Sequence, residues 1–311
     1  MTDTTKRIFD KYEVRKTPDQ RKLFRDYIIS YAKSQGYEAK EERVGKCAYN
    51  VVVGNPKSAS VIYTAHYDTC AVMPLPNFIT PKNILIYLIY QVIMTTIIFT
   101  IPFIIMFGLA PRVYDKTGMY LLYITIMIVG YAALLLTFYL IMKGPANKHT
   151  ANDNTSGVTL LADLMTDMPK EYKDKVAFVF FDLEELGMIG SKSFKKRYPH
   201  VAKKTPVVNF DCVSDGQNML LVLKKRAAHL EPKLAEAFAS NDRYTVEIAT
   251  KGVFYPSDQA QFELGVGVAA LNKTKRGLLY MNRIHTPRDK VYDEENIAFL
   301  KNASIELAKI I

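Results

Sequence analysis

Cysteine is scarce in this chain, and its spacing matches no disulfide framework or zinc finger. The 311 residues contain three cysteines, Cys47, Cys70 and Cys212, with no Cys-x-x-Cys pair. A small and odd number of cysteines is typical of free thiols in a reducing compartment. The opening segment MTDTTKRIFDKYEVRK also lacks the apolar stretch of a cleaved signal peptide. We therefore expect the polar part of the chain to stay in the cytoplasm.

Several short motifs that define large enzyme classes are also missing. The sequence has no His-Glu-x-x-His, no Walker A and no Gly-x-Ser-x-Gly segment. GVGVAA at 265–270 imitates a dinucleotide fingerprint, but it lies late in the chain with no clear helix after it. A nucleotide cofactor is therefore not expected.

Positive charge exceeds negative charge, with a formal net charge of +10. The excess lies in short clusters such as Lys195–Arg197, Lys224–Arg226 and Lys273/Lys275/Arg276. A solvated surface is the simplest interpretation. Attraction to anionic lipid headgroups is the next, and nucleic-acid binding is not expected because no binding motif accompanies the charge.

Charge is absent from two long apolar stretches, residues 84–110 and 118–142. A membrane-spanning helix needs about 20 apolar residues to cross about 30 Å of hydrocarbon, so both stretches are long enough. We expect a transmembrane hairpin over 82–143, inserted between two parts of one domain, 1–81 and 144–311. Pro102 should bend the first helix and Pro111 should end it, leaving a loop of about seven residues.

A tight hairpin returns both of its ends to one side of the membrane. Lys82, Lys143 and Lys148 flank those ends, against Arg112 and Lys116 in the loop. This asymmetry favours a cytoplasmic domain on a protein that crosses the cell membrane twice. The alternative is a hairpin buried in a dimer interface or used as an apolar lid, which is costly for two uncharged stretches of this length.

The remaining sequence alternates strand and helix patterns. Thr17-Pro-Asp-Gln20 is typical of a capped helix start, and that helix should end near Gly36. Strands are expected at 48–53, 59–65, 266–271 and 277–281, and KVAFVFF has the pattern of a central buried strand. A further helix is expected at 227–239. This alternation predicts a three-layer α/β/α sandwich with a mostly parallel central sheet.

Seven acidic and imidazole side chains stand out, most of them at the ends of expected strands. Singly, each has an ordinary structural explanation, such as a core histidine, an N-cap aspartate or a solvated helix start. Ligands of such sheets bind at the carboxyl ends of the strands, so the set together predicts a two-metal hydrolytic centre. The residues are His66, Asp68, Asp153, Glu184, Glu185, Asp211 and His285.

The adjacent pair Glu184-Glu185 follows a wholly apolar strand. Two neighbouring carboxylates there are unfavourable without a cation nearby. One can bind a metal while the other takes a proton from water that the metal has acidified. In His66-x-Asp68, the carboxylate can fix the tautomer of a metal-binding imidazole.

The succession AHYD, ANDNTSG, FDLEELGMIGS, NFD, SDQAQF and IHTPRD resembles the di-zinc exopeptidases of metallopeptidase family 28 (clan MH), over roughly 45–81 and 145–311. The resemblance implies the zinc-exopeptidase (phosphorylase/hydrolase-like) fold and two Zn²⁺ ions. His66, Asp153 and Asp211 would hold one ion, and Asp153, Glu185 and His285 the other. Glu184 would be the general base, and Asp68 would orient His66.

The resemblance also carries departures and rival functions. Ser257-Asp258 lies where the family often has Ser-Asp-His, but Gln259 replaces the histidine. Tyr255, Ser257 and Asp258 are expected near the substrate. We expect a membrane-anchored aminopeptidase acting on peptides. The alternatives are a glutaminyl cyclase-like acyltransferase, whose relatives use fewer zinc ligands, and an inactive membrane scaffold.

Overall fold

A mixed β-sheet lies at the centre of the domain in this computed structural model, which describes residues 1–73 and 75–311. Its strand order is β1-β2-β4-β3-β5-β8-β6-β7, and β9 pairs with β8. The strands are β1 (Ala39–Arg43), β2 (Tyr49–Val53), β3 (Val61–His66), β4 (Val176–Phe181), β5 (Val207–Phe210), β6 (Asn218–Leu223), β7 (Thr245–Ala249), β8 (Gly265–Lys273) and β9 (Leu279–Tyr280).

The sheet is less parallel than the sequence predicted. Within the described residues, four strand pairings are parallel and four are antiparallel. The central strands β4, β3, β5 and β8 are mutually parallel, as expected for strands joined by helical crossovers. The β1–β2 and β8–β9 pairs are hairpins with short turns, which need no crossover and are therefore antiparallel.

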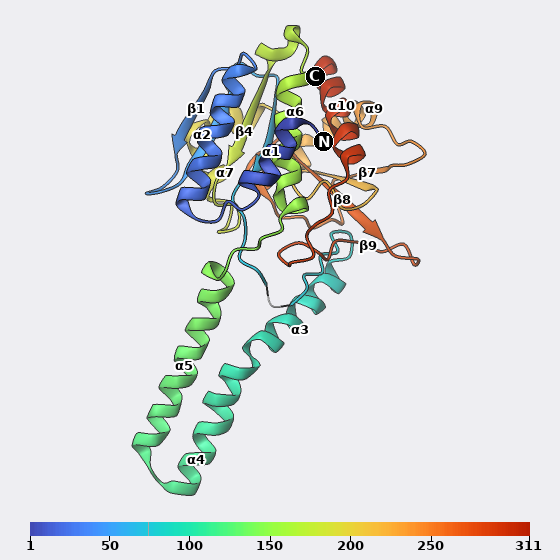
Figure 1. Cartoon of the computed structure of the whole chain (residues 1–311). Helices are drawn as coiled ribbons and strands as arrows, with labels where there is room; N and C mark the ends of the chain where they lie inside the picture. The colour runs from blue at the N-terminus through green and yellow to red at the C-terminus, as the bar shows by residue number, and fades with distance from the viewer. Residues whose placement is uncertain (74) are drawn as a thin grey trace.

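Helices cover both faces of the sheet (Figure 1). One face packs on α1 (Asp3–Tyr12), α2 (Pro18–Ser34), α6 (Ser156–Asp167), α9 (Glu231–Ala237) and α10 (Glu294–Ile310). The other packs on α7 (Ile189–Arg197) and α8 (Pro199–Lys204). Alternate residues of one strand serve the two cores: Phe178 lies in the first and Val179 in the second. The expected three layers are present.

Local signals correctly predicted several elements. The Thr17 side chain accepts from the backbone N–H of Gln20, and the Gln20 side chain caps in return, so the capping box opens α2. That helix ends at Ser34, and Gly36 follows with a φ of +85°. All six residues of β4 are buried. The helix expected at 227–239 is instead a 3₁₀ turn, Lys225–Leu230, followed by the short α9.

The apolar hairpin differs from its prediction at the tip. Helix α3 (Ile84–Phe103) continues through a π-helical turn, Ile104–Leu109, into α4 (Ala110–Thr117), so one helix runs from Ile84 to Thr117. Its expected end near Ala110 was wrong. Pro111 lies in the first turn of α4, where its missing N–H costs little after the widened π turn. The chain reverses at Gly118, whose φ is +62°, and returns as α5 (Tyr120–Lys143).

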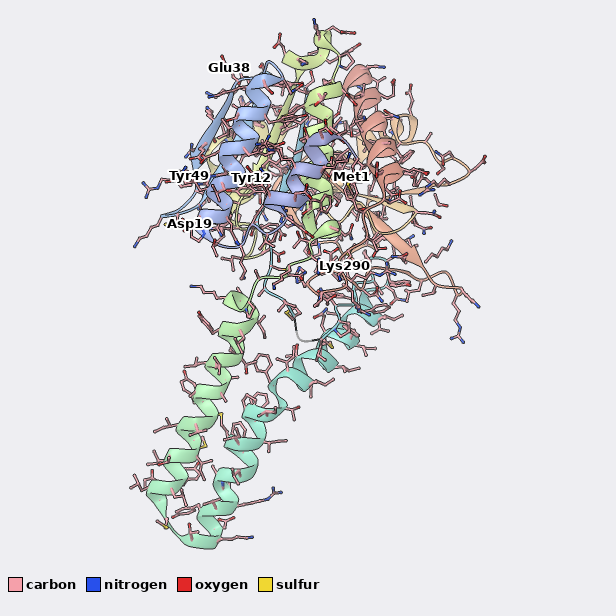
Figure 2. The ribbon with its side chains drawn as sticks, viewed as in Figure 1. Met1, Tyr12, Asp19, Glu38, Tyr49 and Lys290 are labelled. Carbon is pink, nitrogen blue, oxygen red and sulfur yellow. The ribbon has the colours of Figure 1, made fainter. Side chains whose placement is uncertain are left out.

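Both hairpin helices stand away from the domain, with side chains projecting along their length (Figure 2). In the most apolar window of each, 11% and 6% of residues are buried. Gly130 provides a point of close helix contact, because a Cβ there would lie 2.3 Å from Cγ of Met106. Both helices are long and apolar enough to cross a membrane, and neither is buried as a lid over the domain.

Candidate active site

The seven side chains identified from the sequence meet at one edge of the sheet. Four come from the carboxyl ends of adjacent parallel strands: His66 ends β3, Glu184 and Glu185 follow β4, and Asp211 follows β5. Asp68 lies two residues beyond His66. Asp153 lies in the segment Ala151–Thr155, directly before α6, and its own backbone is not helical (φ −113°, ψ 95°). His285 lies in the loop after β9.

One cluster of possible ligands consists of His66, Asp153 and Asp211, all buried. The Nε2 atom of His66 lies 3.2 Å from Oδ1 of Asp153 and 3.5 Å from Oδ1 of Asp211. One ligand atom from each of the three residues lies within 4.8 Å of the others. Imidazole and carboxylate donors at this separation are suited to a divalent metal ion.

A second cluster adjoins the first through Asp153. Nε2 of His285 lies 2.9 Å from Oδ2 of Asp153 and 3.3 Å from Oε2 of Glu185. The two oxygens of Asp153 therefore face two different histidines, which is the arrangement a bridging carboxylate requires. Cys70, which the sequence did not single out, also lies within 4.8 Å of Glu185 and His285.

Asp68 holds the glutamate pair in position. Its Oδ1 accepts the backbone N–H of Glu184 at 2.9 Å, and its Oδ2 accepts that of Glu185 at 3.2 Å. The same Oδ1 lies 3.6 Å from Nδ1 of His66, while the Asp68 carbonyl lies closer, at 3.1 Å. Asp68 therefore contacts both the histidine and the glutamates, and its firmer contacts are to the glutamates.

Asp289 performs a similar task for Asp153 and was not identified from the sequence. Its two oxygens accept the backbone N–H groups of Asn152 at 2.8 Å and Asp153 at 3.0 Å. Asp289 lies in the segment IHTPRD, four residues after His285. Its position beside a recognised histidine was the available signal, although spacing alone does not indicate what it contacts.

The charges in this cluster shift several pKa values. Burial opposes the charged form of His66, but the carboxylates of Asp153, Asp211 and Asp68 raise its pKa well above the usual value. Burial raises the pKa of Glu184 well above its usual value, and nearby carboxylates add to the shift. Burial and the charge of Asp153 raise the pKa of Glu185 to about 8. So many carboxyl groups are difficult to ionise together unless a cation lies among them.

The residues present fit a metal ion. Oε1 of Glu185 is buried with no hydrogen-bond partner among the described residues. A buried carboxylate oxygen without a partner is costly unless something else binds it. The nitrogen and oxygen donors suit zinc and do not exclude cobalt or manganese.

A small cavity of about 140 Å³ opens onto both clusters and has a largely apolar wall. The wall includes Tyr87 from α3, Phe254 and Ile284. Tyr255 also lines it, and its hydroxyl donates to the carbonyl of Asp211 at 2.9 Å, so this group is engaged in a structural contact. A second cavity of about 630 Å³ extends from Glu185 and His285 to the end of α5.

Ser257 and Asp258 do not line the small cavity. Ser257 accepts a hydrogen bond from Asn209 at 3.0 Å, and Asn209 also donates to Gln259 at 3.3 Å. Gln259 therefore belongs to a buried polar network below the site. Asp258 is fully buried, and both its oxygens lack hydrogen-bond partners among the described residues.

Backbone hydrogen bonds connect the hairpin to the site. The N–H of Met73 donates to the carbonyl of His285 at 2.8 Å, and the N–H of Val72 donates to Pro145 at 2.9 Å. The segment that leads into α3 is thus paired with both the segment leaving α5 and the loop of His285. The helices therefore emerge beside the two clusters of candidate metal ligands.

Comparisons with known proteins show the family and the fold of this chain. The model of Peptidase family M28 matches residues 137–308, more than half of the chain, although this range leaves out His66 and Asp68. A search of curated proteins finds no match.

Similar solved structures include both hydrolases and cyclases. The LapA aminopeptidase of Legionella pneumophila has a TM-score of 0.58 at 13% identity, covering 98% of this chain and 69% of that one. The glutaminyl cyclase of Porphyromonas gingivalis scores 0.57 at 14% identity, covering 98% and 95%. A leucine aminopeptidase precursor of Bacteroides thetaiotaomicron scores 0.56 at 13% identity, covering 97% and 93%. At these identities the likeness shows a shared fold.

Proposed function

Because this chain belongs to peptidase family M28, we propose that it is a membrane-anchored, two-zinc aminopeptidase that removes N-terminal residues from peptides. The observation that carries the proposal is the position of Asp153, whose two carboxylate oxygens face His66 and His285 respectively. A single carboxylate between two such ligand groups is what a paired-metal hydrolytic site needs.

Each residue then has a defined task. His66, Asp153 and Asp211 would hold one Zn²⁺, and Asp153, Glu185 and His285 the other. Bound ions would supply Lewis-acid polarisation of the scissile carbonyl and of the attacking water. Glu184 accepts the proton of that water and returns it to the leaving amine. Asp68 keeps the backbone of Glu184 in place through its contact at 2.9 Å.

The hairpin anchors the enzyme in the cell membrane, with both spans inserted and the catalytic domain on the cytoplasmic side. Two helices of suitable length and apolarity support this arrangement. Tyr87 of α3 lines the small cavity, which supports a substrate site beside the first span. Peptides reaching this site would therefore bind close to the bilayer surface.

Glutaminyl cyclisation is the second candidate, because cyclases are among the structures of similar fold. The presence of five candidate ligands in two adjoining clusters favours hydrolysis over this alternative. It also favours an active enzyme over a metal-free membrane scaffold on the same fold.

The test is the Glu184→Gln variant of detergent-purified protein. We expect hydrolysis of aminoacyl amides to be lost while metal content stays at about two ions per chain, since Glu184 moves protons without binding metal. Glu236→Gln, on the exposed face of α9, is the matched control and should retain activity. Loss of metal from the Glu184→Gln variant would show that Glu184 is a metal ligand. If the unmodified protein cyclises an N-terminal glutamine and does not hydrolyse aminoacyl amides, the second candidate is favoured.

A further inference from the structure

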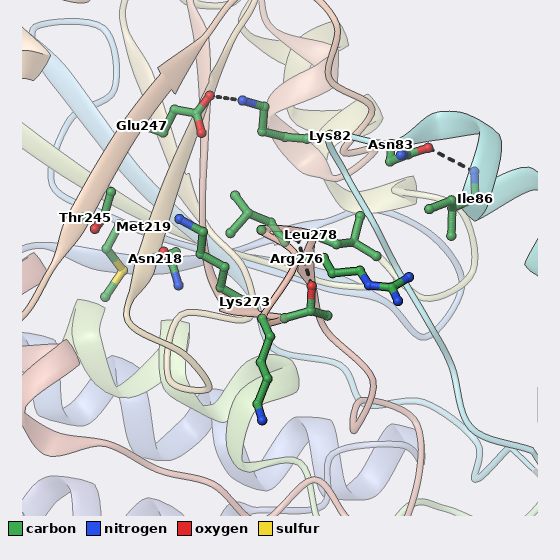
Figure 3. Close-up of a pocket in the computed structure, with 14 residues that line it drawn as sticks. Lys82, Asn83, Ile86, Asn218, Met219, Thr245, Glu247, Lys273, Arg276 and Leu278 are labelled. Carbon is green, nitrogen blue, oxygen red and sulfur yellow. Dashed lines mark hydrogen bonds and ion pairs between the residues drawn. The ribbon is translucent and has the colours of Figure 1, made fainter.

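A separate cavity of about 810 Å³ lies at the edge of the domain beside the start of α3. Its walls come from the first turn of α3, from β6 and β7, and from the turn between β8 and β9 (Figure 3). None of the proposed metal ligands lines it. This cavity is therefore separate from the proposed peptidase site, and a ligand bound in it would serve another purpose.

The lining is strongly cationic. Lys82, Lys273, Lys275 and Arg276 contribute positive charge, and Glu247 contributes the one carboxylate among the lining residues that the structure describes. Glu247 pairs with Lys82, as Figure 3 shows. The other three cations form no ion pair with any residue in the described part of the chain. Three positive charges thus remain for a ligand.

The cationic turn is held in a defined shape. The backbone N–H of Thr274 donates to the carbonyl of Leu278 at 2.9 Å, and the Thr274 hydroxyl accepts from the N–H of Leu278 at 3.0 Å. Gly277 has a φ of +86°, a left-handed conformation that closes the turn at little cost for glycine. Leu279, which follows, is buried in the core. The turn therefore presents Lys275 and Arg276 without needing to fold around a ligand.

The opposite wall is the beginning of the apolar hairpin. The Asn83 side chain accepts from the N–H of Ile86 at 3.1 Å and so opens α3, and Ile86 itself is exposed and lines the cavity. Leu85, on the same turn, is 66% exposed. A ligand in this cavity would thus meet cations on one side and an apolar helix that leads away from the domain on the other.

We propose that this cavity binds the phosphate headgroup of an anionic phospholipid, with the acyl chains lying along α3. Lysine and arginine side chains donate charge-assisted hydrogen bonds to phosphate oxygens, and basic groups beside a membrane span attract anionic lipid. The bound lipid would fix the angle between domain and bilayer. This role is independent of the peptidase chemistry, because it uses other residues in another cavity.

The experiment measures binding of dioctanoyl phosphatidylglycerol to the full-length, zinc-loaded protein in neutral detergent. The cavity variant carries Lys273→Gln, Lys275→Gln and Arg276→Gln. The matched control carries Lys224→Gln, Lys225→Gln and Arg226→Gln. These remove the same charges just beyond the other end of β6, roughly 17 Å along the strand from Asn218, which lines the cavity.

We expect the cavity variant to bind the lipid at least about tenfold more weakly than the wild type, and the control to bind within about twofold. Dioctanoyl phosphatidylcholine and inorganic phosphate should each bind at least about tenfold more weakly than phosphatidylglycerol, because one lacks net charge and the other lacks the apolar chains. Melting temperatures of both variants check that they fold. If the triple variant does not fold, Arg276→Ala at the exposed turn replaces it, and several-fold weaker binding is expected.

Three results would overturn the proposal. If the cavity variant and the control both bind phosphatidylglycerol more weakly to the same extent, the lipid is attracted by the overall charge of the protein and not by this cavity. Inorganic phosphate binding as tightly as the lipid would identify a site for a free anion. Failure of the folded wild type to bind phosphatidylglycerol would show that the cavity is not a site for anionic lipid. Aminoacyl amide hydrolysis, measured in parallel, tests the proposed peptidase function separately, so failure of one does not imply failure of the other.

Discussion

At the scale of single residues, Asp68 is the group on which the geometry of the glutamate pair depends. One carboxylate receives the N–H groups of both Glu184 and Glu185. An asparagine could accept only one of these with its oxygen, and its NH₂ would face the other donor. Replacing Asp68 by asparagine should therefore disturb the position of Glu184 and Glu185 while the fold is retained.

We predict that Asp68→Asn lowers metal affinity or kcat by about 10- to 100-fold, the range typical of residues that orient metal ligands. The measurements are competition with a chromogenic chelator and steady-state hydrolysis. An intact melting curve would establish that the variant folds. Unchanged metal affinity and unchanged kcat together would show that the backbone of β4 holds the glutamates without help.

The raised pKa values lead to a pH dependence of the metal-free protein. Burial, with the charges of neighbouring carboxylates, raises the pKa of Glu185 from 4.5 to about 8 and that of Asp258 from 3.8 to about 7. A group whose pKa is higher in the folded state stabilises the fold fully below its unfolded pKa. That contribution is lost as the pH rises through the folded value.

Histidine titration acts in the same direction. Burial opposes protonation of His285, but the carboxylates of Glu185 and Asp153 raise its pKa to about 10. We therefore expect the chelator-treated protein to melt at a lower temperature at pH 9 than at pH 6. Metal should reduce this difference because it compensates the carboxylate charge. Calorimetry of both forms is the measurement, and a metal-free melting temperature that rises over this interval would contradict it.

At the scale of secondary-structure elements, α3 takes part in the site through one side chain. The ring of Tyr87 lies 5.7 Å from that of Phe254, centroid to centroid, and both line the small cavity beside the metal ligands. A hairpin that served only as an anchor would have no need of such a contact. Helix α3 therefore forms part of the wall of the small cavity.

We predict that Tyr87→Ala raises KM by about tenfold for the preferred aminoacyl substrate, because an apolar wall of the cavity is lost, while metal content is unchanged. Tyr90→Ala, one turn further along α3 and outside the cavity lining, is the control and should leave KM unchanged. Equal effects of the two substitutions would indicate a disturbed helix and no specific cavity wall.

Elements differed in how well their local sequence predicted them. The capping box of α2 and the wholly apolar β4 carry their signals in their own residues, and both were predicted. Strand β1, AKEER, is rich in charge and gives no strand pattern. It forms because β2 offers an edge for pairing. Pro111 was expected to end a helix, but the π turn before it allowed the helix to continue.

At the scale of the whole molecule, the site and the hairpin lie on the same side of the domain. The hairpin emerges beneath the sheet in Figure 1, from segments that hydrogen-bond to each other and to the loop of His285. If the hairpin spans the cell membrane, its tip and the domain are on opposite sides. The three native cysteines offer a direct test, because Cys47 is exposed while Cys70 and Cys212 are buried.

The proposed topology puts the domain in the cytoplasm, and it predicts that a membrane-impermeant maleimide labels Cys47 only after cells are permeabilised. A Lys116→Cys variant, which places a thiol near the tip, should be labelled in intact cells. The Lys116→Cys substitution is made in a chain that also carries Cys47→Ser, so that labelling reports the thiol at position 116 and not Cys47. Labelling of both positions in intact cells, or of neither, would argue against two complete spans, and the reverse pattern would place the domain outside.

The sequence by itself determined the two long apolar helices, the alternation of strands and helices, and the types of side chain at the strand ends. These depend on local composition and periodicity, which each segment carries alone. It also predicted that His66, Glu184, Glu185 and Asp211 would gather, because parallel strands bring their carboxyl ends to one edge of the sheet.

Only the tertiary structure decided which atoms meet. Asp289 contacts the Asp153 backbone across 136 residues of sequence, and Asp68 contacts Glu184 across 116. Tyr87 reaches the small cavity because the segments that flank the hairpin are hydrogen-bonded beside it, and the basic cavity forms where α3 meets the β8–β9 turn. Such contacts depend on how distant segments pack together, and no local pattern of residues encodes that packing.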